Sequence, residues 1–366
     1  MKSLTPFILL VSAYCGLVAY ADPSLDRTDL LSLRDADGTV RVAATPAEWE
    51  PRRTAILEAM QKLMGPLPGP EKRCALDVRI EEETDCGDHV RRLLSYQSEP
   101  EARTPAYLLI PKAALAKDAR DFPAVLCLHP TNAAGNKSIV GLADAPNRGY
   151  ALELARRGFV TIAPPYPLLA DYHPDLKKLG YASGTMKAIW DNIRALDVLE
   201  SLPFVRRGGF GAIGHSLGGH NAIYTAVFDA RIKVIVSSCG FDSYLDYYSG
   251  DPAMWQKGKG WTQERYIPRL ADYAGRLQDI PFDFHGMIAA LAPRRLFVNA
   301  PTGDSNFQWR SVDKVIAAAK KVYALHGVPE RLQVEHPDCP HDFPPDMREL
   351  AYQALNELKA TALPPK

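Results

Sequence analysis

The sequence predicts an α/β fold with a doubly wound, mostly parallel sheet, and two patterns in the chain indicate it. After Pro123, short and continuously apolar segments alternate with amphipathic helical segments. Strands that are apolar on both faces and lie between helices are typical of a parallel sheet covered on both sides. Before that point, three extended segments follow one another with only short turns between them, which predicts an antiparallel start to the sheet.

The expected elements follow in chain order. A helix is predicted over residues 48–63, where apolar side chains recur at helical spacing until Gly65-Pro66 ends the run. Antiparallel strands are expected near residues 76–82, 89–97 and 104–110. Parallel strands are expected at residues 124–128, 160–163, 209–213, 234–236, 296–298 and 331–334. The helices between them are expected at residues 151–157, 186–201, 218–228 and 312–326.

The first 21 residues have the features of an export signal. Lys2 precedes an apolar run at residues 7–18, and Ala19-Tyr20-Ala21 supplies a small-x-small cleavage site. The run is too short to span a hydrocarbon layer of roughly 30 Å. We therefore expect residues 22–366 to form one exported domain, periplasmic or extracellular, with no membrane segment after cleavage.

Charge and composition exclude some classes of function. Lys plus Arg and Asp plus Glu are equal at 43 each, so no overall positive field exists to attract nucleic acid. No spacing of His, Cys and Asp typical of a zinc site occurs, and no metal or cofactor is expected. The oligomeric state is not specified by the sequence.

One short motif points to nucleophilic catalysis. Gly214-His215-Ser216-Leu217-Gly218 lies between a predicted strand and a predicted helix, which is the context of a nucleophile elbow. The flanking glycines are needed because the sharp turn brings neighbouring backbone too close for side chains. Ser216 is therefore the candidate nucleophile.

A serine hydroxyl needs a base and a carboxylate that orients the base, and both follow in the chain. His341 lies in the loop after the last predicted strand and is the expected base. Asp304, just past the preceding strand, is the favoured acid because of its place in the strand order. Asp242, one strand earlier, stays open as the alternative acid.

The negatively charged oxygen that forms on nucleophilic attack needs two backbone donors. The first is expected from Leu217, the residue after the nucleophile. The second should come from the loop after the first parallel strand, which reads His129-Pro130-Thr131. Because Pro130 has no N–H group, the amide of Thr131 is the expected donor.

Residues 241–290 form a long connection between two predicted strands and are expected to cover the site as a cap. Trp255, Trp261 and Tyr266 in this segment are candidate substrate contacts, although aromatic residues are also ordinary packing material. Five cysteines remain after signal cleavage. Cys239 and Cys339 are predicted at the same sheet edge, and a disulfide between them is a further possibility for an exported protein.

Three segments carry a resemblance to a known family: Gly-His-Ser-Leu-Gly-Gly at 214–219, Pro-His-Asp-Phe-Pro at 340–344 and Ser-Gly-Thr-Met-Lys at 183–187. Together they resemble the α/β-hydrolase superfamily, in particular its dienelactone-hydrolase and acetyl-xylan-esterase-like branch. The resemblance implies cofactor-independent hydrolysis of a carboxylic ester, with Ser216, Asp304 and His341 as the triad. Dienelactone hydrolases use a cysteine nucleophile, so the serine in this chain favours the acetyl-xylan-esterase-like members of the branch. The His-Pro-Thr loop departs from the common His-Gly form.

The sequence therefore predicts a serine carboxylic-ester hydrolase that works through an acyl-enzyme. Its expected partner is a small-molecule or polysaccharide ester, such as an acyl or sugar ester of plant polysaccharide. Two alternatives remain: a serine peptidase related to the oligopeptidases, and a binding protein that keeps the fold without turnover.

Overall fold

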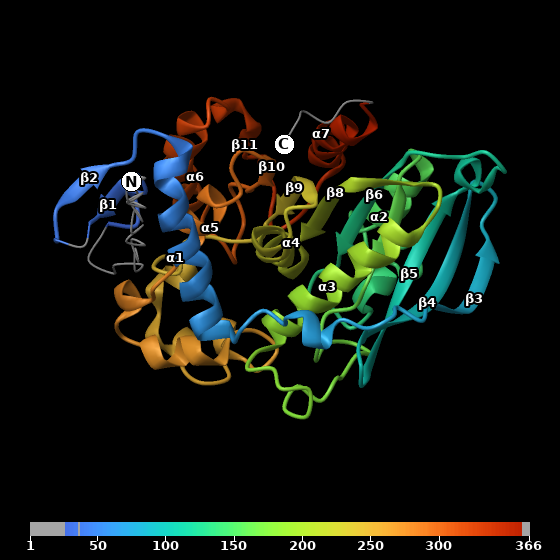
Figure 1. Cartoon of the computed structure of the whole chain (residues 1–366), viewed down its shortest axis with the longest axis horizontal. Coiled ribbons are helices and arrows are strands. Elements are labelled where there is room, and N and C mark those ends of the chain that lie inside the picture. Colours follow the sequence, from blue (N-terminus) through green and yellow to red (C-terminus); the bar gives the residue numbers. More distant parts are fainter. Residues whose placement is uncertain (1–25, 36, 361–366) are drawn as a thin grey trace, which may run out of the picture.

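Figure 1 shows the computed structural model of the chain, which describes residues 26–35 and 37–360. The predicted export signal lies outside the described residues. The main sheet has nine strands in the spatial order β11-β10-β9-β8-β6-β7-β5-β4-β3, and β1 and β2 form a separate two-stranded sheet. The strands are β1 (Ser32–Arg34), β2 (Val40–Val42), β3 (Arg79–Asp85), β4 (His89–Glu99), β5 (Ala102–Pro111), β6 (Phe122–Leu128), β7 (Val160–Ala163), β8 (Val205–His215), β9 (Ile232–Ser238), β10 (Arg295–Asn299) and β11 (Leu332–Glu335).

The α-helices follow the predicted alternation with the strands. They are α1 (Pro46–Met64), α2 (Tyr150–Arg156), α3 (Gly184–Ser201), α4 (Leu217–Phe228), α5 (Phe284–Ala289), α6 (Trp309–Leu325) and α7 (Pro345–Leu355). Short 3₁₀ helices are η1 (Pro70–Lys72), η2 (Lys112–Leu115), η3 (Gly135–Ser138), η4 (Tyr247–Gly250), η5 (Pro252–Trp255), η6 (Gly260–Thr262), η7 (Pro268–Tyr273), η8 (Leu277–Asp279), η9 (Pro329–Arg331) and η10 (Asn356–Lys359).

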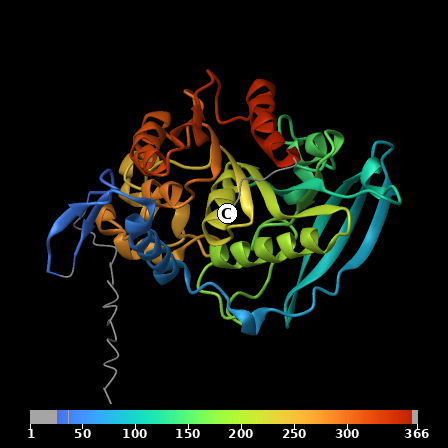
Figure 2. The same cartoon turned by 45° about the horizontal axis from the view of Figure 1, so that its top comes forward.

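The sheet is parallel where the sequence is continuously apolar. β7, β6, β8, β9, β10 and β11 pair in parallel with their neighbours, whereas β5 pairs antiparallel with β7, β4 with β5, and β3 with β4. The predicted doubly wound α/β fold with antiparallel N-terminal strands is confirmed. Figures 1 and 2 show β3, β4 and β5 extending from one side of the molecule as a twisted sheet edge.

Side chains of the central strands alternate between two apolar cores, because successive residues of a strand point to opposite faces. In β6, Ala124, Leu126 and Leu128 belong to the apolar core that also contains side chains of α1, α3, α4, α5 and α6, whereas Val125 and Cys127 belong to the core that contains side chains of α2 and α7. Both faces of the sheet are therefore covered by helices.

The ends of the helices follow from local residues. The side chain of Thr45 accepts a hydrogen bond from the backbone N–H of Glu48 at the start of α1, and Ser183 does the same for Met186 at the start of α3. Gly65 ends α1 with φ = 94°, a conformation that other residues rarely adopt. The helix predicted over residues 186–201 is thus confirmed, and it begins two residues earlier, at Gly184.

The long connection between β9 and β10 holds η4 to η8 and α5. It lies beside α1, where the side chain of Arg269 donates to the backbone carbonyl of Lys62. Sequence reasoning missed α5, α7 and the β1–β2 hairpin, which are short and lack long apolar repeats. Among the described residues, no helix is both long and apolar enough to cross a membrane.

Candidate functional site

Ser216 stands at the turn between β8 and α4, at the carboxyl end of its strand. Its φ is 54° and its ψ is −122°, a backbone conformation that is strained for a residue with a side chain. The turn is held because the Ser216 N–H donates to the Ser238 carbonyl at 2.8 Å and the Ser216 carbonyl accepts from His220 N–H at 2.9 Å. The strain is therefore fixed by the surrounding backbone.

The glycines around Ser216 are required by close backbone contacts. A Cβ atom on Gly214 would lie 2.1 Å from the carbonyl carbon of Gly218, and one on Gly218 would lie 1.9 Å from the carbonyl oxygen of Leu128. Backbone atoms cannot move aside as a flexible side chain can. The spacing of glycines in the motif is thus a steric consequence of the turn.

We expect Gly218→Ala to lower the free energy of unfolding by about 3 kcal/mol or more, because the added methyl group overlaps the backbone of β6. Gly149→Ala is the matched control, since the nearest atom to a Cβ there is a side-chain oxygen at 3.9 Å. Urea unfolding of both variants measures the effect. Equal stability of the two variants would contradict the steric argument.

The structure brings His341 together with Asp304. The Nδ1 atom of His341 lies 2.9 Å from both carboxylate oxygens of Asp304. One of these oxygens also accepts the backbone N–H groups of Asn306 at 2.8 Å and Phe307 at 3.1 Å. The Asp304 side chain is almost fully buried, so the carboxylate is held in place and directed at the imidazole.

Asp242 lies nearby but has no such contact. One carboxylate oxygen accepts the backbone N–H of Gln308 at 3.1 Å, and the other is buried without a hydrogen-bond partner. Burial raises the pKa of Asp242 to about 8, with smaller contributions from the Asp283, Asp246 and Asp304 carboxylates. Of the two candidate acids, the structure therefore pairs His341 with Asp304.

We expect Asp242→Asn to stabilise the protein at pH 8. An ordinary aspartate ionises near pH 4 in the unfolded chain, while the folded protein keeps its proton up to about pH 8. The wild-type free energy of unfolding should therefore fall as the pH rises between these values. The advantage of the variant should reach the order of 5 kcal/mol at pH 8 and shrink toward pH 4. Urea unfolding at both pH values checks this; an advantage independent of pH would contradict it.

A cavity of about 380 Å³ opens over Ser216. Ser216 and His341 both line it, as do Leu217 and Thr131, the two residues predicted to donate to the oxyanion. Its full lining is Pro130, Thr131, Asn132, Arg148, His215, Ser216, Leu217, Tyr247, Tyr248, Gly260, Trp261, Gln263, Tyr266, Asn306, Phe307 and His341. Residues from five separate loops thus meet at the carboxyl ends of the strands.

The connection between β9 and β10 forms one wall of this cavity. Trp261 and Tyr266 line it as expected, and the Tyr266 hydroxyl lies 3.2 Å from Thr131 Oγ1, which links this wall to the predicted oxyanion loop. Trp255 does not line the cavity. It is fully buried against Tyr244 and Tyr247 and packs behind the wall, which corrects its prediction as a substrate contact.

Cys239 and Cys339 are free cysteines in the structure, so the suggested disulfide is not formed. Cys239 is buried beneath His341, and its thiol donates to the backbone carbonyl of Asp342 at 3.3 Å. This contact ties the thiol to the loop that carries His341. Burial raises the pKa of the Cys239 thiol, and the Asp304 carboxylate adds to the increase.

Within the described residues, one group of side chains has the spacing of possible metal ligands. Its donor atoms come from Cys239, Asp304 and His341 and lie within 4.8 Å of one another. Cysteine binds metals as a thiolate, which the raised pKa of Cys239 disfavours, and the Nδ1 atom of His341 already faces Asp304. These residues fit an acid–base pair with a buried thiol beside it better than a metal centre.

Sequence reasoning missed several residues of the cavity. Phe307 and Asn306 come directly after the acid, and Arg148 comes from the loop before α2. His215 also lines the cavity; its Nδ1 atom lies 3.0 Å from Ser238 Oγ and its ring lies 4.8 Å from that of His341. Only His215 had a signal in the sequence, its place beside the nucleophile.

Comparisons with known proteins show what this chain is similar to. Residues 175–327 match the family model described as glucuronyl esterase of fungi. The chain is 26% identical over 284 residues to YtaP of Bacillus subtilis, named as a hydrolase, with 75% of this chain and 88% of that protein covered. It is 28% identical over 174 residues to the 4-O-methyl-glucuronoyl methylesterase of Hypocrea jecorina, but this match covers 43% of the chain and 36% of that enzyme.

Among solved structures, the glucuronoyl esterase from Solibacter usitatus is similar over nearly the whole chain. The TM-score is 0.73 at 18% identity, with 92% of this chain and 99% of that chain covered. At this identity the likeness establishes the fold alone. The chain therefore has the fold of the α/β-hydrolases, and the family model and curated relatives that it matches are named as esterases and hydrolases.

Proposed function

We propose that this chain is a serine carboxylic-ester hydrolase whose triad is Ser216, His341 and Asp304. The observation that carries the proposal is the placement of a strained Ser216 in the same cavity as His341, whose Nδ1 lies 2.9 Å from both oxygens of Asp304. This arrangement leaves the Nε2 atom of His341 available to a serine hydroxyl. It combines an exposed nucleophile, a base and a fixed orienting carboxylate.

The proposed reaction has two halves. The Ser216 oxygen attacks the ester carbonyl while His341 takes the hydroxyl proton, and the same proton passes to the departing alcohol. The N–H groups of Leu217 and Thr131 donate to the negatively charged carbonyl oxygen. In the second half, water gives a proton to His341 and attacks the acyl-enzyme, which releases the acid and returns the proton to Ser216.

We further propose an ester of a uronic acid from plant polysaccharide as the substrate. The matched family model and the Hypocrea jecorina relative are named for esters of glucuronic acid. The cavity supports a sugar, because Trp261, Tyr247 and Phe307 offer aromatic surfaces while Gln263 and Asn306 offer polar groups. Acetyl esters of xylan are the alternative within the same chemistry.

The surroundings of the site add two proposals. The export signal at residues 1–21 supports a periplasmic or extracellular enzyme, where plant polysaccharide would be found. Residues 241–290 would act as a cap on a single domain over residues 22–366, since they supply Trp261 and Tyr266 to the cavity wall.

The test is a substrate panel with the purified mature chain. Methyl D-glucuronate, acetylated xylan, p-nitrophenyl acetate and a peptide substrate would be compared by initial rates. We expect kcat/KM to be highest for methyl D-glucuronate. Cleavage of the peptide but of no ester would favour the peptidase, and turnover of none of the four would favour a non-catalytic binding protein.

A further inference from the structure

Arg148 is the one cavity-lining residue with a permanent charge, and no carboxylate is part of the lining formed by the described residues. It lies at the end of the loop that leads into α2. Its side chain is 17% exposed, so it is largely withdrawn from bulk solvent. A guanidinium in this position faces the same space as Ser216 and His341.

The position of Arg148 is fixed by its contacts on the protein side. Its Nη1 atom donates to one carboxylate oxygen of Asp342 at 2.6 Å, and Asn147 Nδ2 donates to the other oxygen at 2.6 Å. Burial alone would raise the pKa of Asp342, but the hydrogen bonds from Arg148 and Asn147 keep it below its usual value. The ion pair is therefore intact at neutral pH and anchors the guanidinium to the residue after His341.

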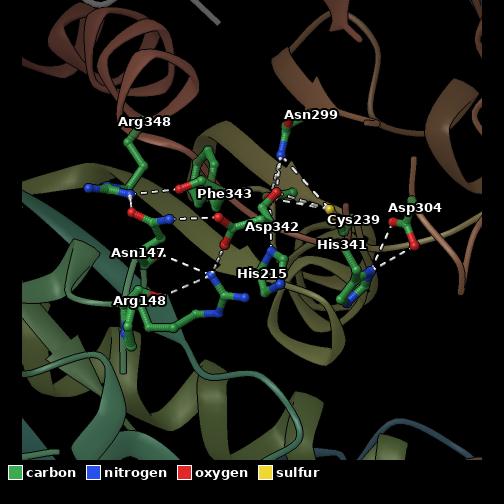
Figure 3. Close-up of polar contacts among 12 residues, drawn as sticks. Asn147, Arg148, His215, Cys239, Asn299, Asp304, His341, Asp342, Phe343 and Arg348 are labelled. Atoms are coloured by element: carbon green, nitrogen blue, oxygen red, sulfur yellow. Dashed lines mark hydrogen bonds and ion pairs between the residues drawn. The ribbon is translucent and has the colours of Figure 1, made fainter. Parts of the chain in front are cut away.

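The remaining nitrogens of the guanidinium are available to a ligand. The hydrogen bonds of Arg148 to Asp342 and to the carbonyls of Pro146 and Asn147 all use Nη1. Within the described residues, Nε and Nη2 make no hydrogen bond, and neither atom is fully buried. Figure 3 shows the free end of the guanidinium directed toward His215, with His341 beyond it.

Among the described residues that line the cavity, none is an anion that could balance these donors. The pKa of His215 is lowered well below its usual value, first by burial and then by the positive charge of Arg148 and the neighbouring His341. His215 is therefore a neutral ring, and its Nδ1 is already engaged with Ser238. In the free protein water can satisfy Nε and Nη2, and a ligand carboxylate would replace that water with a partner of opposite charge.

We propose that Arg148 is the carboxylate-recognising residue of this cavity and binds the uronic acid that ester hydrolysis releases. The adjacent Nε and Nη2 donors of a guanidinium match the two oxygens of a carboxylate. An ester is neutral at that group, whereas the acid product carries a negative charge. The site should therefore bind a uronate more tightly than the neutral analogue. This inference rests on the proposed function for the choice of uronic acid.

The experiment uses the full mature chain with Ser216→Ala, which binds ligands without turnover. Calorimetric titrations at pH 8 would compare D-glucuronate with D-glucuronamide, which has the same shape but no charge. We expect D-glucuronate to bind roughly tenfold more tightly, because a charge-assisted pair replaces neutral hydrogen bonds. Adding Arg148→Gln should reduce the preference to near one, and Arg148→Lys should keep part of it.

Arg156→Gln in the same background is the matched control. Arg156 belongs to α2, pairs with Asp88 and does not line the cavity, so the preference should be unchanged. Equal affinity of the parent for the two ligands, or an undiminished preference in Arg148→Gln, would overturn the proposal. Circular dichroism verifies folding, and Arg148→Lys provides a second variant if Arg148→Gln does not fold.

The two proposals can fail separately. A wild-type chain that hydrolyses methyl D-glucuronate while Ser216→Ala shows no preference for the acid would refute only the role of Arg148. A preference that depends on Arg148 without any hydrolysis of the methyl ester would refute only the proposed function.

Discussion

Replacing Ser216 with alanine is expected to lower kcat for ester hydrolysis by roughly 10⁵ to 10⁶-fold. The substitution removes the atom that forms the acyl-enzyme, while the cavity and the oxyanion donors stay in place. The remaining rate should therefore still exceed that of the uncatalysed reaction. Stopped assays with p-nitrophenyl acetate and methyl D-glucuronate would measure both values.

The design of this test separates catalysis from folding. Ser249→Ala is a suitable control, because Ser249 lies in η4 near the same wall but does not line the cavity. His341→Ala should be as damaging as Ser216→Ala, and the double variant should be no worse than either, since the two side chains act as one unit. Near wild-type activity of the Ser216→Ala variant would contradict the proposed serine mechanism.

The second large effect is expected at the acid. Asp304→Asn should lower kcat by about 10⁴-fold, because an amide cannot stabilise the imidazolium and favours the wrong imidazole tautomer. Asp242→Asn should change kcat by less than about tenfold, since that residue has no contact with His341. The comparison is made with one substrate at one pH in both variants.

This pair of variants is informative because both residues are buried aspartates that accept backbone N–H groups from the same loop. Substitution by asparagine is nearly isosteric in each case. A larger loss in Asp242→Asn than in Asp304→Asn would reverse the assignment of the acid. If both variants kept full activity, His341 would function without an orienting carboxylate.

Sequence patterns predicted the fold because they depend on local physics. Continuous apolar runs such as residues 124–128 are stable only between two layers of helices, and the structure places their alternate side chains in two separate cores. The need for glycine at 214 and 218 could likewise be predicted from the motif, although the contact that excludes a side chain at Gly218 is with Leu128 of β6. Short elements such as α5 were not predicted, because the helix propensity of only six residues is a weak signal.

The candidate site was partly predictable for the same reason. The order of Ser216, Asp304 and His341 along the chain follows the order of strands, and each comes after a strand whose carboxyl end meets the others at one edge. The sequence could not predict roles that depend on which side chains are in contact. The suggestion that Cys239 and Cys339 pair rested on such a guess, and the Cys239 thiol instead contacts the carbonyl of Asp342.

By itself, then, the sequence determined the α/β class, the strained serine turn and the order of the triad candidates, because these depend on residues that are close along the chain. Only the tertiary structure decided that Asp304 rather than Asp242 contacts His341, that Trp255 packs behind the wall, and that Arg148 faces the cavity. These contacts join loops separated by tens to hundreds of residues, and their distances are set by the packing of the whole sheet.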